Sequence, residues 1–76
     1  MKQLIEFLVK SLVDNPQEVA LAEEENSGAV LMQLKVADDD LGKIIGKNGN
    51  TINAIRTVLQ AAASSRKMRV KLDVLS

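Results

Sequence analysis

The sequence predicts a small α+β domain with the element order α-β-β-α-α-β. Apolar residues recur at helical spacing over 1–13 and again over 52–65, which is typical of helices with one buried face. Apolar and polar residues alternate over 30–36 and 68–74, which is typical of half-buried strands. Because two helices separate these two strands, the strands can lie parallel. We therefore expect a mixed three-stranded sheet with its helices on one face.

The first helix is expected over 1–13, and it ends at Asp14-Asn15-Pro16 because the residue before a proline is pushed out of the helical region. Its apolar residues cover about two thirds of the helix circumference, which is more than one small core requires. We expect most of this surface, Phe7 included, to pack against the sheet and part of it to meet another chain. The buried stripe is predicted at Leu4, Ile5, Leu8 and Leu12, with Phe7, Val9 and Val13 off the stripe.

A partly alternating segment over 18–25 is interpreted as a strand that ends in the turn Asn26-Ser27-Gly28. Asp38-Asp39-Asp40 offers capping carboxylates for a short helix over 41–45, and Gly46 ends that helix.

Asn50 or Thr51 is expected to cap the next helix, and Ser64-Ser65-Arg66-Lys67 is expected to be a polar loop before the last strand. The buried residues of this helix are predicted to be Ile52, Ile55, Leu59 and Ala62.

The composition excludes several classes of function. The 76 residues include no cysteine and no histidine, which rules out disulfides, thiol nucleophiles, zinc fingers and imidazole bases. Phe7 is the one aromatic residue, so no platform for stacking bases can be built. No nucleophile–base pair is visible, and we predict neither an enzyme nor a cofactor or small-molecule substrate. No apolar run suits a membrane span or a signal peptide, which predicts a cytoplasmic protein without membrane contact.

The segment 42–49 holds three glycines but fits no nucleotide-binding motif: a P-loop needs four residues between its glycines and Ser or Thr after its lysine. What remains is Gly46-Lys47-Asn48-Gly49 between two helices. Its glycines would let a sugar-phosphate backbone approach closely, and the amide groups of the following helix would face the same place. Lys47 adds a positive charge, and Asn48 can donate a hydrogen bond or adopt a left-handed turn. The same four residues also fit an ordinary turn that connects two helices and has no binding function.

Three blocks, VKSLVDNP (9–16), DLGKIIGKNG (40–49) and IRTVLQAAA (55–63), resemble the small bacterial KH-domain RNA-binding proteins of the KhpA family. The resemblance spans essentially the whole chain. It implies a type II KH domain over 1–76, in which 1–28 is an extension of one helix and one strand and 29–76 is the β-α-α-β core. It also implies that single-stranded RNA binds beside the GXXG loop.

The resemblance further implies a homodimer, or a heterodimer with a larger KH-containing protein, KhpB. The activity it implies is that of an RNA chaperone or post-transcriptional regulator, linked in some bacteria to cell shape and cell-wall synthesis.

Family members often carry a basic residue directly after the loop, where this chain has Asn50. The resemblance therefore implies a phosphate contact that is weaker there or that shifts to Lys43 and Arg56. About three in four of the isoleucines at helical spacing are expected in the core, and Ile45 is the candidate base contact. The candidate RNA-binding residues are Gly46, Lys47, Asn48, Gly49, Lys43, Ile45, Arg56, Arg66 and Lys67.

The zero net charge is the sum of two opposed halves. Residues 1–41 carry three basic and nine acidic residues, net −6, whereas residues 42–76 carry seven basic and one acidic, net +6. Because a bound strand responds to the local field, we predict that RNA binds the side built by the second half.

Two other functions stay open. The first helix could serve a protein–protein adaptor for which RNA contact is incidental. The helix from Asn50 could be the recognition helix of a helix-turn-helix DNA binder, although the flanking strands argue against such a domain.

Overall fold

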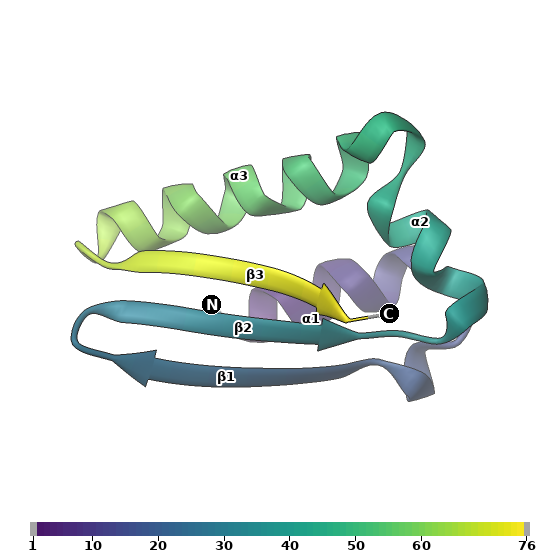
Figure 1. Cartoon of the computed structure of the whole chain (residues 1–76), viewed down its shortest axis with the longest axis horizontal. Helices are drawn as coiled ribbons and strands as arrows, with labels where there is room; N and C mark the ends of the chain where they lie inside the picture. The colour runs from purple at the N-terminus through teal and green to yellow at the C-terminus, as the bar shows by residue number, and fades with distance from the viewer. Residues whose placement is uncertain (1, 76) are drawn as a thin grey trace.

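The computed structural model describes residues 2–75 and has the predicted α+β architecture (Figure 1). A helix opens the chain, a hairpin of two strands follows, and two helices lead to the last strand. The elements are α1 (Lys2–Leu12), β1 (Ala20–Asn26), β2 (Ala29–Lys35), α2 (Leu41–Ile45), α3 (Asn50–Ser65) and β3 (Arg69–Leu75).

The three strands form one mixed sheet in the order β1-β2-β3. β1 pairs antiparallel with β2 through a turn in which Ser27 and Gly28 both have positive φ, as a type I′ hairpin turn requires. β2 pairs parallel with β3, which the crossover through α2 and α3 makes possible. β1 and β3 are therefore the two edges of the sheet.

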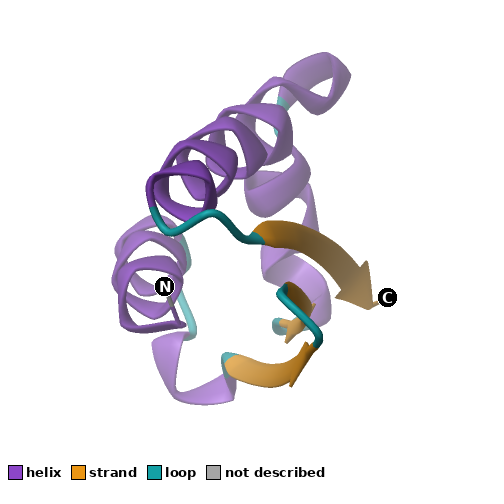
Figure 2. Cartoon of the chain, turned by 90° about the vertical axis from the view of Figure 1, so that its left-hand side faces the viewer, coloured by secondary structure: helices purple, strands orange, loops and turns teal. Residues whose placement is uncertain are grey.

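The helices cover one face of the sheet (Figure 2). Side chains at alternate positions of β2 and β3 point to that face and meet buried residues of all three helices. The buried apolar core consists of Ile5, Val9, Val30, Met32, Leu34, Val36, Ile44, Ile52, Ile55, Leu59, Ala63, Val70 and Leu72.

The buried side of α1 differs from the predicted stripe. Val9 is fully buried beside Ile5, whereas Leu4 and Leu12 are 39% and 44% exposed. Phe7 is 69% exposed, so the prediction that it packs against the sheet is wrong. The apolar residues of α1 surround most of its circumference, and the tertiary arrangement rather than the pattern decides which of them are buried.

Some element boundaries also differ. Glu18 lies in a 3₁₀ turn, Pro16–Glu18, and not in the strand predicted from it. α3 ends at Ser65, as its apolar spacing over 52–65 predicted, so Ser64 and Ser65 are helical and not part of the polar loop expected over 64–67. Ala63 is the fully buried alanine of α3, where the sequence suggested Ala62. Among residues 2–75, none of the helices combines the length and the apolar character that crossing a membrane requires.

Candidate nucleic-acid interface

Gly46 begins the link between α2 and α3. It ends α2, as predicted, with φ 76 and ψ 174, a conformation essentially restricted to glycine. A Cβ at this position would lie 2.8 Å from the backbone nitrogen of Thr51 and 2.6 Å from its Cβ. The close approach that Gly46 permits is therefore between α2 and the first turn of α3, inside the protein.

The next three residues turn the chain into α3. Asn48 and Gly49 both have left-handed backbone, with φ 57 and φ 75, and this conformation is one of the two roles that the sequence suggested for Asn48. A Cβ on Gly49 would come within 4 Å of Asn53 Nδ2 alone, at 3.7 Å, so the space beside Gly49 is open to a ligand backbone. Lys47 and Asn48 are exposed at the tip of the link.

The start of α3 differs from the prediction. Gly49 is its N-cap residue, and no side chain of Asn50 or Thr51 takes that place. The Gly49 N–H donates to the Gly46 carbonyl at 3.2 Å, and the Asn50 N–H donates to the Lys47 carbonyl. These two amides are therefore used within the link and do not face an anion.

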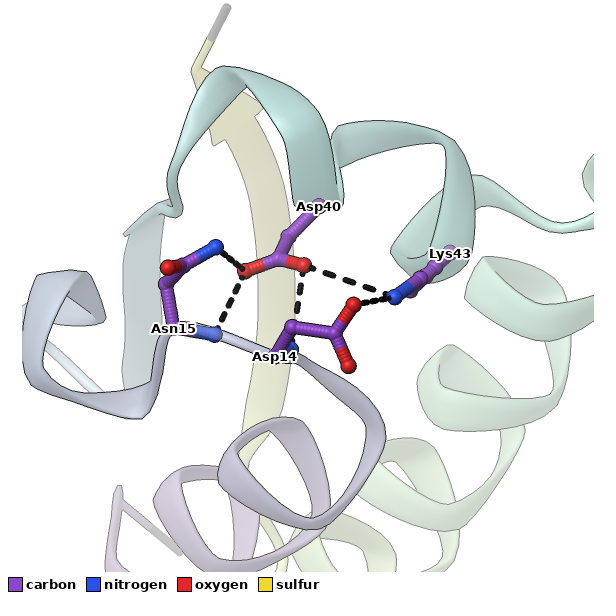
Figure 3. A network of polar contacts seen from close by, with 4 residues as sticks. All are labelled: Asp14, Asn15, Asp40 and Lys43. Atoms are coloured by element: carbon purple, nitrogen blue, oxygen red, sulfur yellow. Dashed lines mark hydrogen bonds and ion pairs between the residues drawn. The ribbon is translucent and has the colours of Figure 1, made fainter.

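Asp40 is a buried carboxylate that joins α2 to the end of α1 (Figure 3). It makes no capping hydrogen bond to its own helix, contrary to the prediction. Its oxygens accept hydrogen bonds from the backbone N–H groups of Asp14 and Asn15, both at 3.0 Å, and from Asn15 Nδ2 at 3.1 Å. The bond from Asp14 is the main reason that the pKa of Asp40 is lowered, against the opposing effect of its burial.

Lys43 lies on the exposed side of the same cluster. Its ammonium group contacts the carboxylate of Asp14 and lies 3.9 Å from Asp40 Oδ1. The hydrogen bond to Asp14 is the main cause that raises the pKa of Lys43, and the fields of Asp14, Asp40 and Asp39 add to it. The candidate phosphate contact at Lys43 is thus already engaged by a carboxylate.

A groove lies between α3 and the outer edge of β3. Arg56 Nε and Nη2 donate to the Leu72 carbonyl at 3.3 and 3.1 Å, and Gln60 Nε2 donates to the Val70 carbonyl at 2.8 Å. Residues 56 and 60 are one helical turn apart, so both reach the same strand. The groove is lined by Arg56, Leu59, Gln60, Val70, Lys71, Leu72 and Asp73.

Arg66 and Lys67 lie at the far end of α3 from the Gly46–Gly49 link, about 24 Å along the helix axis. The Lys67 N–H donates to the Ser64 carbonyl at 3.0 Å, and the Met68 N–H donates to the Ala63 carbonyl at 2.9 Å. This is the Schellman arrangement, in which the residue with left-handed backbone is usually glycine. Here that residue is Lys67, with φ 56.

The candidate residues therefore fall into three places along α3. Lys47, Asn48 and Gly49 lie at its start, where the space beside Gly49 is open, and Lys43 lies on the adjoining α2. Arg56 lines the groove, and Arg66 and Lys67 follow its end. Ile45 is half-buried against the core, whereas Ile44, Ile52 and Ile55 are buried, as expected for most of the isoleucines. Gln60 is a groove residue that is absent from the predicted RNA-binding residues. Its position four residues after Arg56 could have indicated it, because residues at this spacing lie on the same face of a helix.

The two edges of the sheet carry opposite charges. β1 contributes Glu23, Glu24 and Glu25, and β3 contributes two basic residues, Arg69 and Lys71, against one acid, Asp73. In the paired register, Glu24 lies opposite Leu31, which lies opposite Lys71, so the charge changes sign across one row of the sheet. Within the sheet, the acidic and basic halves of the chain thus lie at separate edges, whereas Asp14 and Asp40 of the acidic half lie beside Lys43 of the basic half.

Comparison with known proteins places the chain among bacterial KH domains. A family model described as "KhpA/KhpB, KH domain" matches residues 2–74. The chain is 47% identical over 75 residues to the RNA-binding protein KhpA of Clostridium acetobutylicum, covering 99% of this chain and 100% of the relative. It is 44% identical to the RNA-binding protein KhpA of Chlamydia pneumoniae, covering 99% of this chain and 96% of the relative. No solved structure matches the chain.

Proposed function

The chain belongs to the KhpA/KhpB KH-domain family, and on this premise we propose that it is a non-catalytic protein that binds single-stranded RNA. The relatives named RNA-binding protein KhpA support this activity. The observation that carries the proposal is the Gly46–Gly49 link, with an exposed lysine and an exposed asparagine beside the open space at Gly49.

The link suits the sugar-phosphate backbone because backbone can approach backbone at Gly49 while Lys47 supplies the positive charge. The groove between α3 and β3 lies about two helical turns further along α3 and would receive bases. Arg66 and Lys67 extend the basic side beyond the groove. A KH domain of this kind holds about four nucleotides.

We further propose a single KH domain over 1–76, with 1–28 as its extension, acting in the cytoplasm as an RNA chaperone or post-transcriptional regulator. We also propose a link to cell shape and cell-wall synthesis, which the resemblance stated from the sequence implies. Four nucleotides give limited affinity, so a second binding unit would strengthen binding through avidity. We propose that this unit is a second copy or a larger KhpB-like protein, for which the family description is the support.

The alternative function is that of a protein–protein adaptor that uses α1. The exposed apolar side chains of this helix favour it, since Leu4, Phe7 and Leu12 are 39%, 69% and 44% exposed. An adaptor of this kind would bind RNA without specific phosphate contacts. The salt dependence of RNA binding separates the two functions, because each phosphate contact on a single strand steepens the plot of log affinity against log salt by about 0.7.

The double variant Lys47→Asp with Asn48→Asp tests the proposed function. Both side chains are exposed, so the fold should persist, whereas two carboxylates at the tip should repel the RNA backbone. We expect affinity for a short single-stranded RNA to fall by at least about tenfold at low salt. Fluorescence anisotropy measures this affinity, and circular dichroism checks the fold.

A matched control carries the same change in charge on α1. Lys10→Asp with Gln3→Asp also replaces one lysine and one amide at exposed positions of a helix. The control should retain most of the RNA affinity. Equal affinity of the loop variant and the wild-type protein, or a flat salt dependence, would contradict the proposed function and favour the adaptor.

A further inference from the structure

Lys43 is the one basic residue of α2, and it lies three residues before Gly46. Its position on the helix that leads into the Gly46–Gly49 link suits it to meet the same RNA backbone as Lys47. Its ammonium group instead contacts the carboxylate of Asp14, which follows the end of α1 (Figure 3). The two residues are 29 positions apart in the sequence.

The carboxylate of Asp14 is held beside Lys43 by the backbone to which it belongs. The N–H groups of Asp14 and Asn15 donate to Asp40, whose side chain is fully buried. Asp40 immediately precedes α2, so the turn after α1 is fastened to the helix that carries Lys43. Because this backbone is already fixed, the Asp14 side chain loses little conformational entropy when it contacts the ammonium group.

The pair is nevertheless accessible to an incoming anion. The side chain of Lys43 is 44% exposed and that of Asp14 is 77% exposed. Ion pairs with this exposure are weak because water screens them and both side chains lose freedom in forming them. A phosphodiester oxygen could therefore replace the Asp14 carboxylate at Lys43, but it would approach against the negative charge of Asp14.

We propose that Asp14 is an intramolecular competitor that limits how strongly the RNA backbone binds at Lys43. In the free protein the carboxylate of Asp14 forms an ion pair with the ammonium group of Lys43. A phosphate group of the RNA must displace this carboxylate in order to bind Lys43. Asp14 thereby sets the affinity and the salt dependence at this end of the interface. The inference rests on the proposed RNA-binding function and assigns Asp14 a role opposite to that of Lys47.

The substitution Asp14→Asn tests this competition. Asparagine keeps the shape of the side chain and the backbone N–H that donates to Asp40, but it removes the charge that holds Lys43. We expect the affinity for a short single-stranded RNA to rise about threefold or more at low salt. The plot of log affinity against log salt should steepen by up to about 0.7, the contribution of one phosphate contact, because Asp14 leaves that contact only partly made in the wild-type protein.

Two further proteins separate the competition from a simple change in net charge. Asp38→Asn makes the same change at a nearby exposed aspartate that makes no ion pair with Lys43, and we expect it to raise affinity less and to leave the salt slope unchanged. Lys43→Gln removes the proposed phosphate contact. In a protein that carries Lys43→Gln, adding Asp14→Asn should change affinity no more than Asp38→Asn does.

Each outcome of these measurements is decisive. Equal gains for Asp14→Asn and Asp38→Asn, or a gain from Asp14→Asn that persists with Lys43→Gln, would overturn the competition and leave the proposed function intact. A wild-type protein without measurable RNA affinity would overturn both. A gain specific to Asp14→Asn that requires Lys43, with a steeper salt slope, supports the competition. Thermal melts of each variant confirm that the proteins compared are folded.

Discussion

At the scale of single residues, Gly46 and Gly49 occupy equivalent ends of a GXXG sequence but meet different surroundings. A side chain on Gly46 would run into the backbone and side chain of Thr51, whereas one on Gly49 would come near Asn53 Nδ2 alone. The first glycine is therefore required for the junction of α2 with α3. The second leaves space for a ligand.

Substitution of Gly46 by alanine should destabilise the fold. The backbone conformation alone should lower the free energy of unfolding by about 1–3 kcal/mol, and the clash with Thr51 adds to that loss. Gly42→Ala is the control, because Gly42 lies in α2 with nothing within 4 Å of an added Cβ, and alanine there should stabilise by about 0.5–1 kcal/mol. Urea unfolding measures both, and equal stabilities for the two variants would refute this assignment.

The residues that the sequence could not place are those with partners distant in the chain. Asp40 resembles a capping residue in the sequence, but its hydrogen bonds go to residues 25 and 26 positions earlier. Arg56 resembles a free basic residue, but it donates to a carbonyl 16 positions later. Patterns of neighbouring residues in the sequence do not reveal contacts over such separations. The end of α2 at Gly46 and the left-handed backbone at Asn48 agree with the sequence because both depend on the conformational range of the residue itself.

At the scale of elements, prediction was most accurate where one face of an element is buried and the other is exposed. The strand predicted over 30–36 is β2, Ala29–Lys35, and its strict alternation leaves one arrangement of faces. α1 was placed correctly along the chain but rotated about its axis, since Val9 and not Leu12 is buried. When apolar residues cover most of a helix, the sequence pattern does not determine which side packs against the sheet.

The end of α3 supports a prediction about stability. Lys67 occupies the left-handed position of the Schellman arrangement, where a side chain costs roughly 1–2 kcal/mol. Lys67→Gly should therefore raise the free energy of unfolding by about 1 kcal/mol, although it should weaken RNA binding by removing a basic group. The control is Arg66→Gly, because Arg66 has φ −102 and glycine there relieves no strain. Thermal unfolding that ranks the two variants equally would argue against strain at Lys67.

At the scale of the whole molecule, Asp40 fastens the N-terminal segment to the helices of the interface. The Asp40 carboxylate accepts its three hydrogen bonds more strongly when it is ionised, and its pKa is lowered in the folded protein. Its contribution to stability is therefore fully present above its ordinary pKa of about 4 and is lost as the pH falls through the lower folded pKa. The acid stability of the domain should depend on this one group more than on exposed acids.

Comparison of Asp40→Asn with the wild-type protein tests this dependence. The variant should be less stable at pH 7, and the difference between the two free energies of unfolding should shrink as the pH falls from about 4 to about 2. Asp39→Asn, at an exposed neighbour, should follow the wild-type curve closely. A difference between Asp40→Asn and the wild-type protein that stays constant down to pH 2 would show that the carboxylate is not the group that titrates.

The covered edge of β3 affects the tendency of this protein to aggregate through its sheet. Edge strands tend to recruit strands from other molecules, which leads to aggregation. Arg56 and Gln60 already occupy the outward carbonyls at Leu72 and Val70, so β3 offers an incoming strand few acceptors. β1 remains open, but three consecutive glutamates make two copies of that edge repel each other at neutral pH. Polymerisation of the sheet is thus opposed at one edge by two occupied carbonyls and at the other by charge.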